Sequence, residues 1–205
     1  MMNFRLMSRQ DIPGVVALQS ACFPPPFPQD LLWNATHLNR HLDIFHEGQY
    51  VCESNGVIVG SGSASLISQA NWNAHLSWEQ TLGGFMFETY DPNGTTMYGA
   101  DISVHPDYRK KGIAKQIYLL RFETVKKLGL TRYGTACRIP DFQAHYKNNP
   151  NLTTNSYATL VSNNYFTDRT LSPLLKMGLN LIGVIDNYME DFESNNSAAL
   201  LEWKP

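Results

Sequence analysis

One segment of the chain combines a strand end, a turn, concentrated positive charge and small residues. Val104 ends an alternating apolar run, Pro106 follows, and the next stretch reads Arg109, Lys110, Lys111, Gly112, Ile113, Ala114 and Lys115. The first N–H groups of a helix lack internal partners and lie at the positive end of its dipole, so a helix start can bind an anion. Gly112 lets a ligand approach the backbone closely because it has no Cβ. We therefore predict a ligand whose diphosphate lies over residues 109–115.

The positive charge at this helix start would also suit a solvated face or a nucleic-acid contact. A run of basic residues is usually a solvated helix face, and in some proteins it binds nucleic acid. The chain has 16 Lys and Arg residues against 18 Asp and Glu residues, a formal net charge of −2. Proteins built mainly for nucleic acid normally carry a clear basic excess, so we expect no nucleic-acid partner. We favour phosphate binding because Gly112 and Ala114 give access where a phosphate needs it.

The apolar pattern predicts a strand, a helix and a second strand around this segment. Residues 97–104 alternate like a strand, with the even-numbered apolar residues on one side and Asp101 and Ser103 on the other. Residues 113–128 follow as a helix whose apolar stripe runs to Leu128, and Gly129 ends it. Residues 131–138 form the next strand, which implies a right-handed crossover between parallel strands.

The rest of the chain is predicted as short strands and helices without a linker or an internal repeat. We therefore expect a single domain over residues 1–205. Residues 70–96 and 139–170 read as irregular, with one helix near 157–161. The other expected elements are a strand at 4–6, a helix after Ser8 that ends at the proline-rich loop 23–28, a helix from Asp30 to about His46, a hairpin of 49–53 and 57–68 around Asn55-Gly56, a helix at 171–177, and strands at 179–189 and 198–203.

Several classes of protein are disfavoured by the residues that the chain lacks. No disulfide framework or paired zinc motif can be built from the three scattered cysteines, Cys22, Cys52 and Cys137. His37 and His41 have the spacing of HExxH, but Leu38 replaces the Glu, so we expect no metal. The first residues are too polar for a signal peptide, and no apolar run approaches the about 20 residues of a membrane span. We expect a reduced, soluble, cytoplasmic protein with no membrane partner.

The segment Val104-x-Pro106-x-x-Arg109-x-x-Gly112-x-Ala114 resembles the acetyl-CoA-binding motif of the GNAT acetyltransferase superfamily, R/Q-x-x-G-x-G/A. The expected order of elements is similar to that family over nearly the whole chain. The resemblance implies the α/β GNAT fold, a mixed and mostly antiparallel central sheet with a splayed parallel strand pair and flanking helices. A narrower resemblance, to the GNAT module fused to nitrilase-like carbon–nitrogen hydrolases, is carried by Ile44–Gln49, Asp91–Gly94, Tyr98–Ala100, Arg138–Pro140, Gly183–Tyr188 and Ala199–Trp203.

This resemblance implies acetyl-CoA as co-substrate and a position for each of its parts. The main chain of Ile102, Ser103 and Val104 would pair with the pantetheine arm as if it were another strand. The N–H groups of residues 109–115 would bind the diphosphate. Strand 131–138 would splay from strand 97–104 and open a slot for the thioester. The acceptor would enter between the proline-rich loop, residues 70–96 and the last strands.

Acetyl transfer to a primary amine also needs a base, a donor to the thioester carbonyl and a proton for the thiolate. Asp101 is our first candidate for the base, ahead of Glu88 and Asp91, although a structural hydrogen bond would account for Asp101 equally well. A backbone N–H at a bulge of the strand, which we place at Val104, would polarise the carbonyl.

The usual general acid of the family is missing from its expected place. Many GNAT enzymes have a Tyr four residues before the Gly that closes the helix ahead of the final strands, and counting back from Gly178 reaches Leu174. The candidates for a replacement are Tyr146, Tyr157, Tyr188 and His145, and unassisted departure of the thiolate is the alternative. The missing Tyr also leaves a rival function open, a non-catalytic acyl-CoA-binding module that acts as a sensor or docking unit. A small-molecule or protein acceptor and a homodimer both remain compatible with the sequence.

Overall fold

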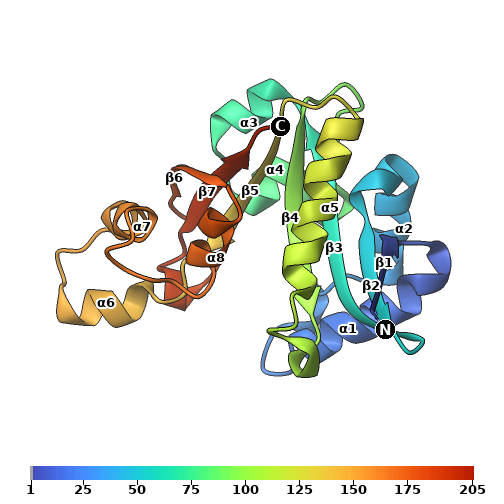
Figure 1. Cartoon of the computed structure of the whole chain (residues 1–205), viewed down its shortest axis with the longest axis horizontal. Helices are drawn as coiled ribbons and strands as arrows, with labels where there is room; N and C mark the ends of the chain where they lie inside the picture. Colours follow the sequence, from blue (N-terminus) through green and yellow to red (C-terminus); the bar gives the residue numbers. More distant parts are fainter. Residues whose placement is uncertain (1) are drawn as a thin grey trace.

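The computed structural model describes residues 2–205, which fold around a seven-stranded sheet (Figure 1). The strand order is β1-β2-β3-β4-β5-β7-β6, and within the described residues β4–β5 is the one parallel pair. This sheet is the mixed, mostly antiparallel one that the family resemblance implies. The strands are β1 (Met2–Leu6), β2 (Tyr50–Ser54), β3 (Val57–Ile67), β4 (Thr96–Val104), β5 (Arg132–Arg138), β6 (Asn180–Ile185) and β7 (Ala198–Trp203).

Helices cover both faces of the sheet and bury a separate apolar cluster on each. One face carries α1 (Ile12–Cys22), α2 (Ala35–Phe45), α3 (Gln69–Ala74) and α4 (Trp78–Leu82). The other face carries α5 (Ile113–Lys127), α6 (Phe142–Asn148), α7 (Thr154–Ser162) and α8 (Leu171–Lys176). Single 3-10 turns connect these elements: η1 (Arg9–Asp11), η2 (Gln29–Leu31), η3 (His46–Gly48), η4 (Gly84–Met86), η5 (Pro106–Tyr108) and η6 (Phe192–Ser194).

Local turn chemistry confirms the elements that depended on short sequence signals. Asn55 and Gly56 both have positive φ, 51° and 78°, which is the conformation of a two-residue hairpin turn between β2 and β3. The α5 helix ends next to Gly129, whose φ is 65°. The N–H of Leu130 donates to the carbonyl of Val125 at 3.0 Å, as in a glycine-terminated helix.

The expected start of the second helix is wrong, because the capping residue is Asn34 rather than Asp30. The Asn34 side chain accepts a hydrogen bond from the His37 N–H at 3.0 Å, and α2 begins directly after it. Asp30 lies in the separate turn η2. The structure differs from two further expectations. Residues 139–170 contain α6 in addition to the expected helix near 157–161, and β6 ends at Ile185 although the strand was expected to reach residue 189.

The predicted alternation of β4 fails at Ala100, where the strand contains a bulge. The pairing with β3 shifts from Ser63↔Asp101 to Ala64↔Gly99, so Ala100 is an extra residue. An extra residue reverses which face each later side chain points to. Ala100 packs with the α1–α4 cluster, whereas Ile102 packs with the α5 cluster. The bulge therefore directs the Asp101 side chain toward α1. With strict alternation this side chain would point to the α5 face instead.

The buried stripe of α5 also differs from the predicted one. Ile113 and Ile117 are buried as expected, but Leu128 is 40% exposed. Tyr118 and Arg121 are buried, whereas Leu128 is not, and they lie on the side of the helix that meets the sheet. A buried arginine side chain fits because the sheet has glycines beneath it at Gly62 and Gly99.

Candidate functional site

β4 has a free edge where it separates from β5. The two strands pair from Thr96↔Arg132 to Gly99↔Thr135 and then diverge, after which β5 pairs with β7 (Figure 1). The His105 N–H donates to the Val59 carbonyl at 3.0 Å, and the antiparallel register continues from there. Alternation along that register directs the main-chain groups of Ile102 and Val104 away from β3. The predicted splay is therefore present, and it leaves N–H and C=O groups available on one edge.

The free edge of β4 leads into the N-terminus of α5. Gly112 has a φ of 81° and precedes the helix, and a Cβ placed on it would meet no atom within 4 Å. The Gln116 N–H makes the bond to the Gly112 carbonyl at 3.0 Å. The N–H groups of residues 113–115 come before that bond and have no helical partner. This open, electropositive helix start fits a phosphate-bearing ligand.

The basic residues of this segment have different surroundings. Arg109, Lys110, Lys111 and Lys115 are exposed, which suits a diffuse positive charge around an anion. Lys111 lies over the Tyr108 ring, with Nζ 4.5 Å from the ring centroid, and the Arg109 Nε is 3.4 Å from the Val104 carbonyl. The Ile113 side chain is in the core, so it can offer a ligand its N–H alone. Ala114 is half-buried.

Polar side chains of α1 and β4 hold the Asp101 carboxylate on the face of the sheet that carries α1–α4. The Ser103 hydroxyl donates to its Oδ2 at 3.1 Å, and the Gln19 amide nitrogen is 3.3 Å from the same oxygen. Burial raises the pKa of Asp101 above its ordinary value, and hydrogen bonds from Trp33 and Ser103 oppose that shift. A carboxylate with a raised pKa is a stronger base than an ordinary aspartate, which suits a group that accepts a proton in catalysis.

Arg121 lies under the bulge on the other face of the sheet, and sequence reasoning missed it. Its Nη2 donates to the Asp101 carbonyl at 2.6 Å and to the Ser63 carbonyl at 2.9 Å, and its Nη1 donates to the Tyr133 hydroxyl at 2.9 Å. The side chain is 1% exposed, and no carboxylate pairs with it within residues 2–205. Gly62, which leaves space for its guanidinium, is the signal in the sequence that could have indicated it.

The bulge of β4 is at Ala100, whereas the sequence analysis placed it at Val104. The Ala100 carbonyl accepts from the Trp78 indole Nε1 at 3.0 Å. Val104 pairs regularly opposite Gly60. The free-edge N–H nearest to the bulge is therefore that of Ile102, while Val104 lies farther toward α5.

The four candidate proton donors named from the sequence lie in other surroundings. Tyr146 is 39% exposed on α6 and stacks on Phe142, with ring centroids 5.6 Å apart. The Tyr157 hydroxyl donates to Asp168 at 3.0 Å. The hydroxyls of Tyr188 and Tyr98 are 2.9 Å apart and hydrogen-bonded. The His145 ring stacks on Phe166. Each of these side chains has a structural partner.

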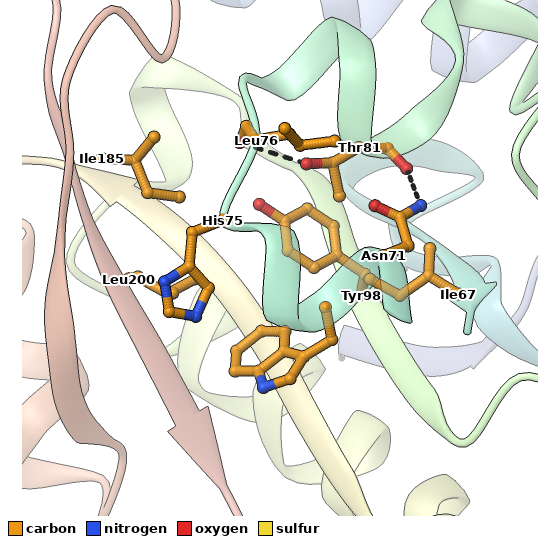
Figure 2. Close-up of a pocket in the computed structure, with 9 residues that line it drawn as sticks. Ile67, Asn71, His75, Leu76, Thr81, Tyr98, Ile185 and Leu200 are labelled. Atoms are coloured by element: carbon orange, nitrogen blue, oxygen red, sulfur yellow. Dashed lines mark hydrogen bonds between the residues drawn. The ribbon is translucent and has the colours of Figure 1, made fainter. Parts of the chain in front are cut away.

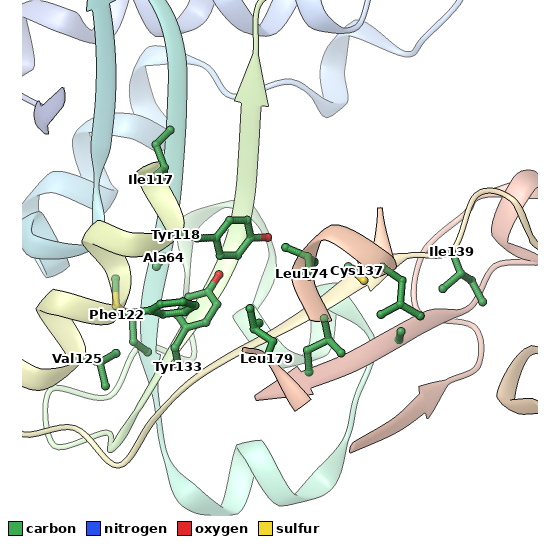
Figure 3. Packing of buried hydrophobic residues seen from close by; sticks show 14 of the residues in the cluster. Ala64, Ile117, Tyr118, Phe122, Val125, Tyr133, Cys137, Ile139, Leu174 and Leu179 are labelled. Carbon is green, nitrogen blue, oxygen red and sulfur yellow. The ribbon is translucent and has the colours of Figure 1, made fainter. Parts of the chain in front are cut away.

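Tyr118 lies opposite Leu174, the position where a tyrosine is usual (Figure 3). The Tyr118 hydroxyl points toward Leu174 in Figure 3, and the ring packs edge-on to Tyr133 with centroids 5.8 Å apart. Burial raises the pKa of Tyr118 well above its ordinary value, so the phenol stays protonated. Sequence analysis missed it because it falls within the helix and not before the final strands.

A small cavity lies farther along the same face of the sheet as Asp101. Tyr98, Thr81, His75 and Ile185 are among its lining residues (Figure 2). Its volume is ≈ 10 Å³, which is room for one water at most. No group of three metal-ligating side chains occurs within residues 2–205, and no helix in that range is long and apolar enough to cross a membrane.

Comparisons with known proteins agree with this geometry. The sequence model of the acetyltransferase (GNAT) family matches residues 12–146. YkwB of Bacillus subtilis (strain 168), an uncharacterized N-acetyltransferase, is 36% identical over 203 residues, which are 99% of this chain and 88% of that protein. YhcX of the same organism, a probable hydrolase, is 32% identical over 98% of this chain, which spans 38% of its length.

The fold is shared with solved structures at low sequence identity. The GphF GNAT-like decarboxylase in complex with isobutyryl-CoA has a TM-score of 0.79 and 19% identity, with 98% of each chain covered. Together with the matched family, the splayed β4–β5 pair and the open start of α5 define the class of protein. This chain belongs to the GNAT acetyltransferase family and is an acyltransferase.

Proposed function

We propose that the protein transfers an acetyl group from acetyl-CoA to a primary amine while both are bound. The observation that carries this proposal is the continuity between the free edge of β4 and the open N-terminus of α5. The edge can pair with an extended amide-bearing arm, and the helix start can bind the phosphates attached to it. The GphF structure, which holds isobutyryl-CoA, supports an acyl-CoA ligand for this fold.

The main chain of β4 would hold the donor in place. The N–H and C=O groups of Val104 pair with the pantetheine arm, and the Ile102 N–H, next to the bulge, polarises the thioester carbonyl. The side chains of Arg109, Lys110, Lys111 and Lys115 add positive charge around the diphosphate. Ser103 belongs to the same stretch, but its hydroxyl supports Asp101.

Asp101 would accept the proton that the acceptor ammonium must lose. The neutral nitrogen then forms the new C–N bond as the C–S bond of the thioester breaks. The sulfur takes a proton from the Tyr118 hydroxyl, and the second proton lost by the nitrogen restores Tyr118 through solvent, so one proton is released per turnover. We give this role to Tyr118 in place of the sequence candidates such as Tyr146, since the Tyr118 hydroxyl faces Leu174 (Figure 3).

Direct transfer is favoured over an acyl-enzyme on Cys22. This thiol is at the end of α1, near Asp101 and Arg109. Burial raises its pKa above the ordinary value, and the Asp101 charge acts in the same direction. The thiolate, which is the nucleophilic form of cysteine, is therefore scarce at neutral pH.

The test follows release of free CoA with a thiol reagent across a panel of primary amines, next to thermal stabilisation by acetyl-CoA. We expect amine-dependent CoA release and an equal amount of acetylated amine. Stabilisation by acetyl-CoA without release on any amine would instead indicate the acyl-CoA-binding module. Equal stabilisation by DNA or RNA would contradict the site at α5.

A further inference from the structure

Three aromatic rings gather on the α1–α4 face beside Asp101, and we name Trp33, Trp78 and Phe85 the aromatic triad. Their centroids are 5.9 Å apart for Trp33 and Trp78, 5.8 Å for Trp33 and Phe85, and 5.5 Å for Trp78 and Phe85. The rings come from the loop before α2, from α4 and from η4. Residues far apart in the sequence therefore converge on one place.

The two indole rings lie beside the bulge, and that of Trp78 is hydrogen-bonded to it. The Trp78 Nε1 donates to the Ala100 carbonyl at 3.0 Å, and Trp33 is close enough to the Asp101 carboxylate to lower its pKa. Trp33 is 5% exposed and packs against the other two rings, whereas Trp78 and Phe85 are half-buried. A negative carboxylate and partly accessible aromatic rings thus lie next to each other.

No lysine or arginine of the described residues lies over a ring of the aromatic triad. Within residues 2–205 the cation–π pairs involve the rings of Tyr108, Tyr118, Tyr133, Trp203 and Trp72, and none involves the aromatic triad. His37 stacks on Phe85 at 5.1 Å, but burial lowers the pKa of His37, so this imidazole is neutral at pH 7. No cation within the described residues occupies the place where an ammonium would gain from the ring faces.

We propose that the acceptor is a primary amine carried on an apolar or aromatic body, with its ammonium bound between Asp101 and the aromatic triad. This inference rests on the proposed transferase function and names its substrate class. The rings hold the body of the substrate, and they attract the ammonium before Asp101 removes its proton. The Asp101 carboxylate would repel a carboxylate on the same substrate, so an α-amino acid of the same shape is a poor acceptor.

The test compares three probes that share a primary amine: 2-phenylethylamine, phenylalanine, which adds a carboxylate to the same body, and ethanolamine, which lacks the body. Turnover is followed by CoA release, and amine binding to the CoA-loaded protein by calorimetry. We expect kcat/KM for 2-phenylethylamine to exceed that for each of the other two at least about tenfold, since the body and the missing carboxylate both favour it.

Two variants and one control locate the effect. Phe85→Leu should raise KM for 2-phenylethylamine about fivefold, with kcat and acetyl-CoA affinity nearly unchanged, because a ring face is lost. Trp78→Leu should raise KM by a similar factor and also lower kcat, because it leaves the Ala100 carbonyl at the bulge without its donor. Phe192→Leu, at a ring that is 78% exposed in η6, should change none of these values.

The outcomes distinguish the proposed aromatic amine acceptor from the proposed acetyltransferase function. Similar kcat/KM on all three amines, or a preference for phenylalanine, would overturn the substrate class and leave the transferase intact. Binding of 2-phenylethylamine without acetylation would support the aromatic amine site and contradict the transferase. If 2-phenylethylamine neither binds nor reacts, the proposal is wrong.

Discussion

The Nη2 of Arg121 is 2.6 Å from the carbonyl oxygen of Asp101, although the Asp101 carboxylate points to the opposite face of the sheet. The same nitrogen donates to the Ser63 carbonyl at 2.9 Å, so one guanidinium joins the two residues that pair beside the bulge. A buried cation on the α5 face thereby fixes the backbone that presents the candidate base on the other face.

Replacing Arg121 should weaken both folding and base function. Arg121→Met leaves two buried carbonyls without their side-chain donor, and we expect the free energy of unfolding to fall by about 3 kcal/mol in urea titrations. The Arg121 charge also lowers the pKa of Asp101, so its removal should move the acid limb of kcat/KM to higher pH. Arg121→Lys keeps the charge and should shift that limb less. If the acid limb of kcat/KM has the same pH midpoint in the parent and both variants, Arg121 does not influence the ionisation of Asp101.

Asp101→Asn should separate catalysis from stability. Turnover should fall about 100-fold or more if the carboxylate is the base, with acetyl-CoA affinity within about twofold of the parent. Burial raises the pKa of Asp101, so its ionised form destabilises the native state at neutral pH. Asn should therefore raise the melting temperature at pH 7, and this gain should vanish below the ordinary carboxyl pKa. Glu88→Gln, at an exposed carboxylate, is the control, and a larger loss of turnover there would transfer the role to Glu88.

Tyr118→Phe tests the proton donor. We expect kcat to fall about 100-fold while KM for the amine stays constant, since the hydroxyl acts on the departing sulfur. Because burial raises the pKa of Tyr118 far above its ordinary value, the parent should show no alkaline loss of kcat from this group below about pH 10. Tyr157→Phe provides a matched control, since that hydroxyl bonds to Asp168. An unchanged kcat in Tyr118→Phe would mean that the thiolate leaves without Tyr118.

The ion pair at the start of the chain should govern acid stability. Arg5 holds the pKa of Asp11 at about 2, and the two side chains form hydrogen bonds of 2.6 and 2.8 Å. A lowered pKa means that the stabilisation is present above the unfolded carboxyl pKa and is lost as pH falls toward 2. Asp11→Asn should cost about 2 kcal/mol at pH 7 and almost nothing at pH 2, measured by urea unfolding at both values. An equal cost at both pH values would contradict this assignment.

Features that depend on short signals could be predicted from the sequence, and features that depend on a partner strand could not. Gly112 after a strand and a proline turn indicated the helix start, and Asn55-Gly56 indicated the hairpin, because each signal is complete within a few residues. The bulge at Ala100 exists only in relation to β3, so the alternation of apolar residues gave no sign of it.

The same reason accounts for the site residues that sequence analysis missed. Arg121 counts as a solvated charge until Gly62 of another strand is known to lie beneath it. Tyr118 became a candidate only when α8 placed Leu174 opposite its hydroxyl. Tyr146, one of four candidates for the tyrosine missing at Leu174, lies on α6 with its ring against Phe142.

The central claim is that the N-terminus of α5 binds the diphosphate of CoA, and one pair of variants tests it most directly. Gly112 and Gly56 both have positive φ and open space around a Cβ, so Gly112→Leu and Gly56→Leu carry similar backbone strain. Calorimetry with CoA should show at least about 30-fold weaker binding for Gly112→Leu, a loss of about 2 kcal/mol, and parental affinity for Gly56→Leu. Parental affinity in a folded Gly112→Leu protein would contradict the account.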